Sequence, residues 1–427
     1  MATGARVIAA GFPFGGYRLL ATPLPRRLAQ AGAATLLNSG CNFVLGLLLV
    51  RHLAPRVFGA CAMLTTLQGF AGVLLTALVT QQMGHVLPRL RHPARQRASA
   101  RVFASVAWWC VAAFVPVTAV TLLALDLPAG VVAAGSAFVA ATGLRSHARS
   151  YLYALRQPRT VLAQDAVFVA LTAGGIASVG VTAGLVEVLI VLTLANLVAI
   201  MGSPAVRSLR TGRHRVRRHV AAYRRHAARA GWSLVTIALS TASALSPNLA
   251  LASTGSLAAL AVVAAPAALL APLRLMALTF QASLRAEFAA LIHAGRRRAV
   301  RGMYVASTAL ALLACLLLGA ALWHGWAWLV PRVFAQGYDA QAIGHATALA
   351  FAVVAVNVVR LPGAVLLNVM GVFRFSAATL MVVVPGVLAL ACWLAHGGHV
   401  AAVLYPAVAG ELIVLIAELT MLWRRVR

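Results

Sequence analysis

The sequence contains no lysine and only seven acidic residues, so charged residues make up 10% of its 427 positions while hydrophobic residues make up 62%. A soluble domain of this size needs a polar surface that such a composition cannot provide. The sequence therefore predicts a polytopic membrane protein. Its formal charge of +29 comes from arginines that separate apolar stretches, and this distribution disfavours a nucleic-acid-binding protein, whose basic residues would share one soluble face.

Features that enzymes and metalloproteins need are missing as well. The five cysteines lie far apart without C-x-x-C spacing, so we expect neither disulfides nor a metal site. No Walker-type glycine loop is present, and ATP is therefore not the direct energy source. The histidines lie mostly in basic or outer loops without nearby carboxylate or cysteine partners. We expect no enzymatic activity, no cofactor, no metal and no cleaved signal peptide.

Apolar stretches long enough to span a membrane occur twelve times. A helix needs about 20 such residues to cross ~30 Å of hydrocarbon. The predicted spans are 31–50, 58–80, 102–124, 130–148, 161–180, 184–204, 232–253, 257–281, 303–323, 343–361, 376–395 and 400–422.

The arginines support this division. With the N-terminus in the cytoplasm, 32 of the 36 arginines fall in cytoplasmic segments, as the positive-inside rule requires. Three fall outside (Arg51, Arg56 and Arg332), and Arg274 lies within a span. The sequence therefore predicts an all-α protein of twelve transmembrane helices with both termini in the cytoplasm.

The longest polar run covers residues 207–231 and holds nine arginines, three histidines and no acid. It separates two apolar blocks, each with six predicted spans. The fourth span of each block runs into a pair of arginines fourteen residues apart (Arg145 and Arg159; Arg360 and Arg374), as a duplicated six-helix unit would predict. The predicted parts are a cytoplasmic N-terminal segment (1–30), an N-terminal six-helix bundle (31–206), a basic cytoplasmic linker loop (207–231) and a C-terminal six-helix bundle (232–427).

Two outer turns resemble a known family. The first, LVRHLAPRVFG at 49–59, resembles the R-x-L-G-P-x-x-Y-G signature that follows the first helix of polysaccharide flippases. These are the Wzx-like O-antigen and lipid-linked oligosaccharide branch of the multidrug/oligosaccharidyl-lipid/polysaccharide exporter superfamily. The second, VPRVFAQGYDA at 330–340, is similar to the F-G-x-x-Y-x-x-A turn between the ninth and tenth helices of that family.

The resemblance implies two six-helix bundles arranged as a V around a central cavity, which the first, second, seventh and eighth helices line. Such proteins move an undecaprenyl-pyrophosphate-linked oligosaccharide, such as an O-antigen, capsule or exopolysaccharide unit, across the bacterial cytoplasmic membrane by alternating access. The implied partners are this lipid-linked oligosaccharide, membrane lipids, H⁺ or Na⁺, and a polysaccharide polymerase with its chain-length regulator.

The four implied cavity helices carry polar residues that are candidates for substrate binding. Asn38 and Asn42 are four residues apart and share a helix face. Gln68 lies near the middle of the second span, and Ser240 belongs to a polar stripe on the seventh. Asn248 follows Pro247, where we expect the helix to break. Hydrogen bonding between helices is the alternative role for each of these side chains.

Arg274 is the sharpest candidate for substrate binding. It lies about 25 Å from the outer end of the eighth span, in the inner half of the bilayer. An arginine buried there costs at least about 2.5–3.5 kcal/mol on insertion and usually faces a cavity or a partner. Its guanidinium could clamp a phosphate through two hydrogen bonds. The alternative is that it extends to the cytoplasmic surface.

Acids inside spans are candidates for ion coupling, above all Glu411 and Asp165, with Glu418 one heptad beyond Glu411. Such a carboxyl group is neutral, paired with an arginine, or a site for H⁺ or Na⁺.

Two other functions stay open. An ion-coupled multidrug or small-molecule exporter of the same fold should carry acids in its cavity, and an O-antigen polymerase-type enzyme should have a large arginine-bearing outer loop. The scarcity of acids and the short outer loops favour the flippase.

Overall fold

The computed structural model describes residues 23–426 except 88–89, 91, 156, 181–183, 204–215, 335–336 and 371. The first half consists of α1 (Pro23–His52), α2 (Pro55–Leu75) continued by a π-helical turn η2 (Thr76–Thr80) and α3 (Gln81–Val86), α4 (Pro93–Leu123), α5 (Ala129–Ala154), α6 (Pro158–Val179) and α7 (Leu185–Met201). The second half consists of α9 (Val216–Ala244), α10 (Ser246–Ala252), α11 (Leu257–Leu269), α12 (Ala271–His293), α13 (Arg297–Val333), α14 (Ala340–Val369), α15 (Phe373–His396) and α16 (Leu404–Val426), with a short 3₁₀ turn η5 (Ala401–Val403) before α16.

Every predicted span falls on one of these helices or on a consecutive pair of them. Nine of the described helices are long and apolar enough to cross a membrane, and α9 with α10 makes a tenth span that is bent by 67°. The remaining two spans are α7 and the α11–α12 pair. The described residues contain no strand. The predicted all-α fold of twelve transmembrane helices in two repeated halves is therefore confirmed.

Prolines account for the breaks inside the second half. Pro247 lies in the first turn of α10 and cannot donate a backbone hydrogen bond to the end of α9, so the predicted break occurs at Leu245. The eighth span, predicted as one helix, is divided at Leu270 into α11 and α12, with Pro272 in the first turn of α12. Arg274 consequently lies in the first turn of a new helix.

The predicted linker loop differs from the structure. Residues 204–215 lie outside the described part, but from Val216 onward the chain is helical and runs directly into the seventh span as α9. Arginine and alanine, which dominate this segment, are strong helix formers. The segment also packs against the first half, since the Tyr223 hydroxyl donates a hydrogen bond to the Leu78 carbonyl oxygen and the Tyr223 ring meets Phe103 edge-on at 6.2 Å.

The Leu78 carbonyl lies within the π-helical turn η2, where the wider spacing of main-chain hydrogen bonds releases a carbonyl for another donor. Burial raises the pKa of Tyr223 to about 12, so its hydroxyl remains protonated and able to donate. Farther along α9, Leu239 and Ala242 pack with Leu380 on α15 and Val414 on α16. One helix thus contacts both halves.

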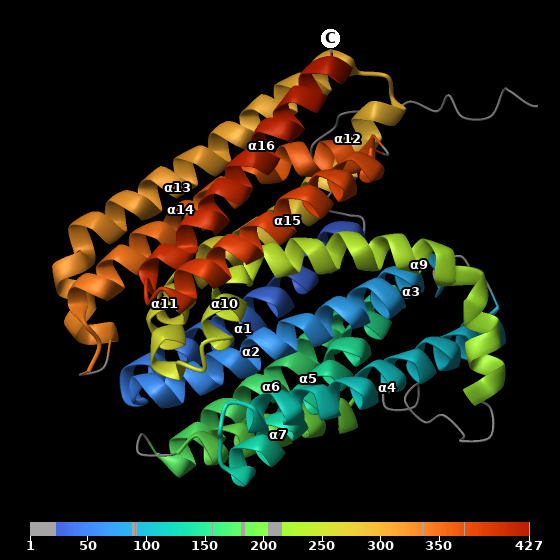
Figure 1. Cartoon of the computed structure of the whole chain (residues 1–427). Helices are drawn as coiled ribbons and strands as arrows, with labels where there is room; N and C mark the ends of the chain where they lie inside the picture. Colours follow the sequence, from blue (N-terminus) through green and yellow to red (C-terminus); the bar gives the residue numbers. More distant parts are fainter. Residues whose placement is uncertain are drawn as a thin grey trace, which may run out of the picture.

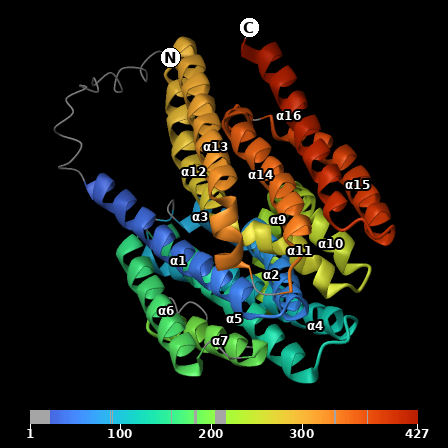
Figure 2. The same cartoon turned by 90° about the vertical axis from the view of Figure 1, so that its left-hand side faces the viewer.

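The two halves lie together at one end of the molecule and diverge toward the other (Figures 1 and 2). At the converging end α2 packs against α11, and the diverging end holds the C-terminus of α16. In the predicted topology the converging end is outer and the diverging end is cytoplasmic.

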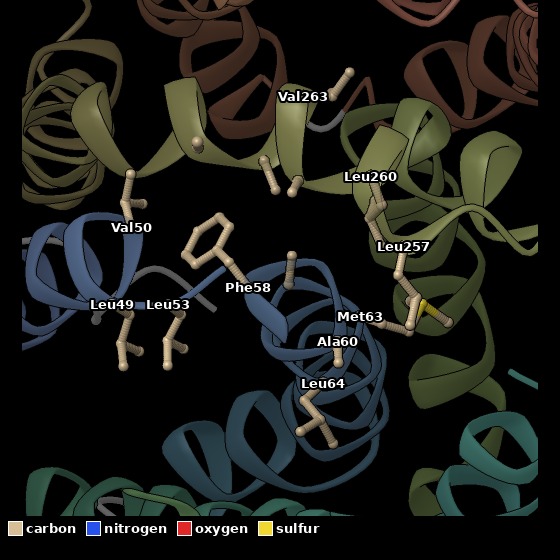
Figure 3. Close-up of a cluster of buried hydrophobic side chains, with 14 of the residues drawn as sticks. Leu49, Val50, Leu53, Phe58, Ala60, Met63, Leu64, Leu257, Leu260 and Val263 are labelled. Carbon is tan, nitrogen blue, oxygen red and sulfur yellow. The ribbon is translucent and has the colours of Figure 1, made fainter. Parts of the chain in front are cut away.

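The converging end is closed by apolar side chains from both halves. Figure 3 shows Phe58 on α2, Val50 on α1, and Leu257 and Leu260 on α11 among its members. The two motif turns that carry the family resemblance also meet here, because Arg51 Nη1 donates a hydrogen bond to the Arg332 carbonyl oxygen at 2.9 Å. These turns therefore connect the first half to the second.

Gly59 on α2 allows this helix to approach the main chain of α11 closely. A Cβ atom at position 59 would lie 1.8 Å from the Leu257 carbonyl oxygen, which is main chain and cannot rotate away. We expect Gly59→Ala to lower the stability of the detergent-purified protein by at least ~1–3 kcal/mol, the usual cost of overpacking. Gly72→Ala on the same helix is the matched control, because a Cβ there meets nothing within 4 Å. That control should be neutral or stabilising. Equal melting temperatures for the two variants would contradict the close approach.

Candidate functional site

A buried charge cluster joins three helices of the first half. Asp165 on α6 is fully buried, and its two carboxylate oxygens accept hydrogen bonds from Arg145 Nη1 at 3.1 Å and Arg149 Nη2 at 2.9 Å. Arg145 also donates from Nη2 to Asn38 Oδ1 on α1, and its guanidinium carbon lies 3.7 Å from the centroid of the Phe168 ring. We call Arg145, Arg149, Asp165 and Asn38 the N-terminal cluster.

A second buried cluster lies in the other half. Arg360 on α14 donates from Nη1 to Glu418 Oε1 at 3.0 Å, and its Nε lies 3.2 Å from Glu411 Oε2. The same Glu411 oxygen accepts a hydrogen bond from Asn357 Nδ2 at 3.3 Å. We call Arg360, Glu411, Glu418 and Asn357 the C-terminal cluster. It fastens α14 to α16.

Arg145 and Arg360 are the two positions that the predicted duplication makes equivalent, and both anchor a buried cluster. The carboxylates are not equivalent, since Asp165 comes from the fifth helix of its half whereas Glu411 and Glu418 come from the sixth. The charges also differ. The N-terminal cluster has two guanidinium groups for one carboxylate, and the C-terminal cluster has one guanidinium group for two carboxylates.

The prediction that these arginines lie in loops is wrong. Arg145 and Arg149 lie within α5, which continues to Ala154, and Arg360 lies within α14, which continues to Val369. Inside the helix bundle, these arginines pair with carboxylates of neighbouring helices. Among the alternatives for Asp165 and Glu411, the structure shows pairing with arginine, and ion coupling through either residue stays a prediction.

The predicted substrate-binding residues do not form one contact group. Asn38 belongs to the N-terminal cluster. Asn248 Nδ2 donates to Thr66 Oγ1 on α2 at 2.9 Å and so links the two halves. Asn42 and Ser240 are exposed and Gln68 is half-buried. The central cavity that these residues were expected to line stays a prediction.

Arg274 is exposed, and it forms no ion pair with any residue in the described part of the chain. Two apolar neighbours in the same part of α12, Leu273 and Ala277, pack against α13 and α14. These contacts fix the orientation of the first turns of α12. The same helix also contacts α1 of the first half. Arg274 therefore lies on a helix that borders both halves.

No group of three or more histidine, cysteine or acidic side chains in the described ranges is arranged to bind a metal ion. The two charge clusters contain arginine at their centres, and a guanidinium group repels a metal cation.

No protein-family profile and no curated protein sequence matches the chain, but solved structures share its fold. An inward-facing multidrug-resistance transporter of the MATE family, within the MOP superfamily, has a TM-score of 0.65 at 12% identity, covering 92% of this chain and 94% of that one. The lipid II flippase MurJ, in an inward closed conformation, has a TM-score of 0.68 at 8% identity over 91% and 86%. A MOP-superfamily transporter from Pyrococcus furiosus, described as having a binding pocket of reverse polarity, has a TM-score of 0.57 at 12% identity over 97% and 99%.

At these identities the likeness shows the fold alone. The chain is a multi-pass membrane protein with the fold of these transporters. A lipid flippase and multidrug transporters share that fold, so the fold by itself does not assign a function to this chain.

Proposed function

We propose that this protein is a transporter that flips an undecaprenyl-pyrophosphate-linked oligosaccharide across the bacterial cytoplasmic membrane by alternating access. The observation that carries the proposal is Arg274. An arginine in the first turn of a helix is unfavourable with respect to the helix dipole, and Arg274 has no carboxylate among the described residues to offset this. An anionic substrate group would supply the missing charge, and a pyrophosphate matches the forked guanidinium.

The placement of the acids supports the same substrate class. Asp165, Glu411 and Glu418 are all held by arginines inside their own half. They are therefore not presented to a substrate between the halves. An exporter of cationic drugs needs such a carboxylate, whereas a carrier of a pyrophosphate does not.

The shape supports access from the inner leaflet. The halves are packed together at the predicted outer end and diverge at the predicted cytoplasmic end (Figure 2). A lipid-linked sugar made in the cytoplasm would enter at the diverging end, with its lipid tail remaining in the bilayer while the polar head group passes between the halves.

Deleting the gene in its bacterial host tests the proposal. We expect the deletion strain to accumulate lipid-linked oligosaccharide and to lose the corresponding surface glycan, because a glycan and a pyrophosphate cannot cross hydrocarbon unaided. Thin-layer chromatography of radiolabelled lipid extracts measures the first effect, and glycan blotting measures the second. Normal glycan together with new sensitivity to cationic drugs would instead identify a multidrug exporter.

A further inference from the structure

The C-terminal cluster carries more negative than positive charge in a place with little water. The side chains of Arg360, Glu411 and Glu418 are 12%, 7% and 4% exposed, respectively. With both carboxylates ionised, one negative charge remains without a counter-charge. Burying such a charge is costly, and a buried carboxyl group avoids the cost by taking up a proton.

The hydrogen bonds identify which carboxylate takes the proton. Glu411 Oε2 receives the Asn357 amide and lies against Arg360 Nε, so its negative charge is doubly stabilised. Glu418 has one donor, Arg360 Nη1, on Oε1, and its Oε2 is buried with no hydrogen-bond partner. A proton on Oε2 would leave the bond from Arg360 to Oε1 intact and would make the cluster neutral.

Among the described residues, Arg360 is the only cation that interacts with Glu418. Tyr304 on α13 is the other titratable group close enough to interact with Glu418, and a phenol carries no positive charge. The neighbouring helix α15 packs on α16 through apolar residues such as Val387, which lies against Gly410. The membrane-spanning residues of α9 and α10 (234–252) include no charged residue.

The N-terminal cluster provides an internal comparison. Asp165 has a guanidinium donor on each of its two oxygens and an excess of positive charge around it, so neither of its oxygens lacks a donor as Oε2 of Glu418 does. The two equivalent arginines therefore lie in different surroundings. Arg360 faces two carboxylates in the second half, whereas Arg145 shares one carboxylate with Arg149 in the first half.

The geometry points to Glu418 as a proton-binding site in the second half, with Arg360, Glu411 and Asn357 as its fixed surroundings. The bound species is a proton from water on Oε2. The inference goes beyond the proposed function, because it holds whichever substrate the protein carries.

Infrared difference spectroscopy of the purified full-length protein between acidic and alkaline buffer tests this site. The observable is the carbonyl stretching band of a protonated carboxyl group. We expect a band from a buried carboxyl group in the wild type, its loss in Glu418→Gln, and its retention in Glu287→Gln, which changes an exposed acid on α12. Glu411→Gln removes the excess negative charge beside Arg360 and should therefore move the titration of the band to lower pH. Retention of the band in Glu418→Gln, its absence from the wild type, or its removal by Na⁺ at constant pH would overturn the proposal.

Size-exclusion chromatography establishes that each variant is folded. If Glu418→Gln does not fold, Glu418→Asp serves instead: the band should persist with a shifted frequency or titration midpoint, and an unchanged band would overturn the assignment. These spectra require no transported substrate. A failure of the proposed flippase function would therefore leave the expected bands unaltered, and the two proposals fail separately.

Discussion

Arg274→Ala should abolish glycan export in a strain that depends on this protein, while the variant still inserts into the membrane. Two charge-assisted hydrogen bonds to a pyrophosphate contribute roughly 1.5–3 kcal/mol each. Their loss should lower transport at limiting substrate by about 10²–10⁴-fold. Surface glycan and lipid-linked intermediate are measured in cells, and the amount of protein in isolated membranes is measured by immunoblotting.

Two companion variants separate substrate binding from a general effect of charge. Arg285→Ala removes another exposed arginine of α12, three turns farther on, and should leave export near the wild-type level. Arg274→Lys keeps the charge but not the forked geometry and should recover only part of the activity. Wild-type export by Arg274→Ala at equal protein levels would exclude this residue from the substrate site.

Asp165→Ala should strongly destabilise the first half, because it leaves Arg145 and Arg149 without their counter-charge in a buried position. Removing one partner of a buried ion pair costs about 3–5 kcal/mol. Arginine cannot escape this cost by losing its proton. Thermal unfolding in detergent, followed by tryptophan fluorescence, measures the loss, and Glu287→Ala at an exposed position is the matched control.

The combined replacement of Asp165 by leucine and of both arginines by methionine should recover much of the lost stability, because apolar side chains of similar volume often replace buried ion clusters without penalty. A single Asp165→Ala variant as stable as the wild type would show that the N-terminal cluster does not hold α5 and α6 together.

Much of the fold could be predicted from the sequence because two independent patterns agree. The apolar spans are long enough to cross a bilayer, and the arginines alternate between them. The errors have physical causes. The predicted fourth and tenth helices end near Arg145 and Arg360, because a charge in a sequence indicates the surface. A carboxylate on another helix cannot be recognised from the sequence as the partner of such a charge.

The candidate site was predicted less completely for the same reason. Asn38 was expected to face the cavity, but it accepts a hydrogen bond from Arg145, which is 107 positions away in sequence. Arg274 could be found because it is the one arginine that the predicted topology places inside a span. Glu418 could be noted as an acid but not distinguished from Glu411, since they differ in the hydrogen-bond donors that α14 presents to each of them.

The contacts of α9 with both halves restrict movement of one half relative to the other. Tyr223 fixes the start of this helix to the first half, and Leu239, about four turns later, fixes its continuation to the second. Between them lies Gly231, a residue type that favours helix less than any other except proline, and an added Cβ there would contact nothing. Any movement of one half relative to the other would therefore require α9 to bend or one of these two contacts to break.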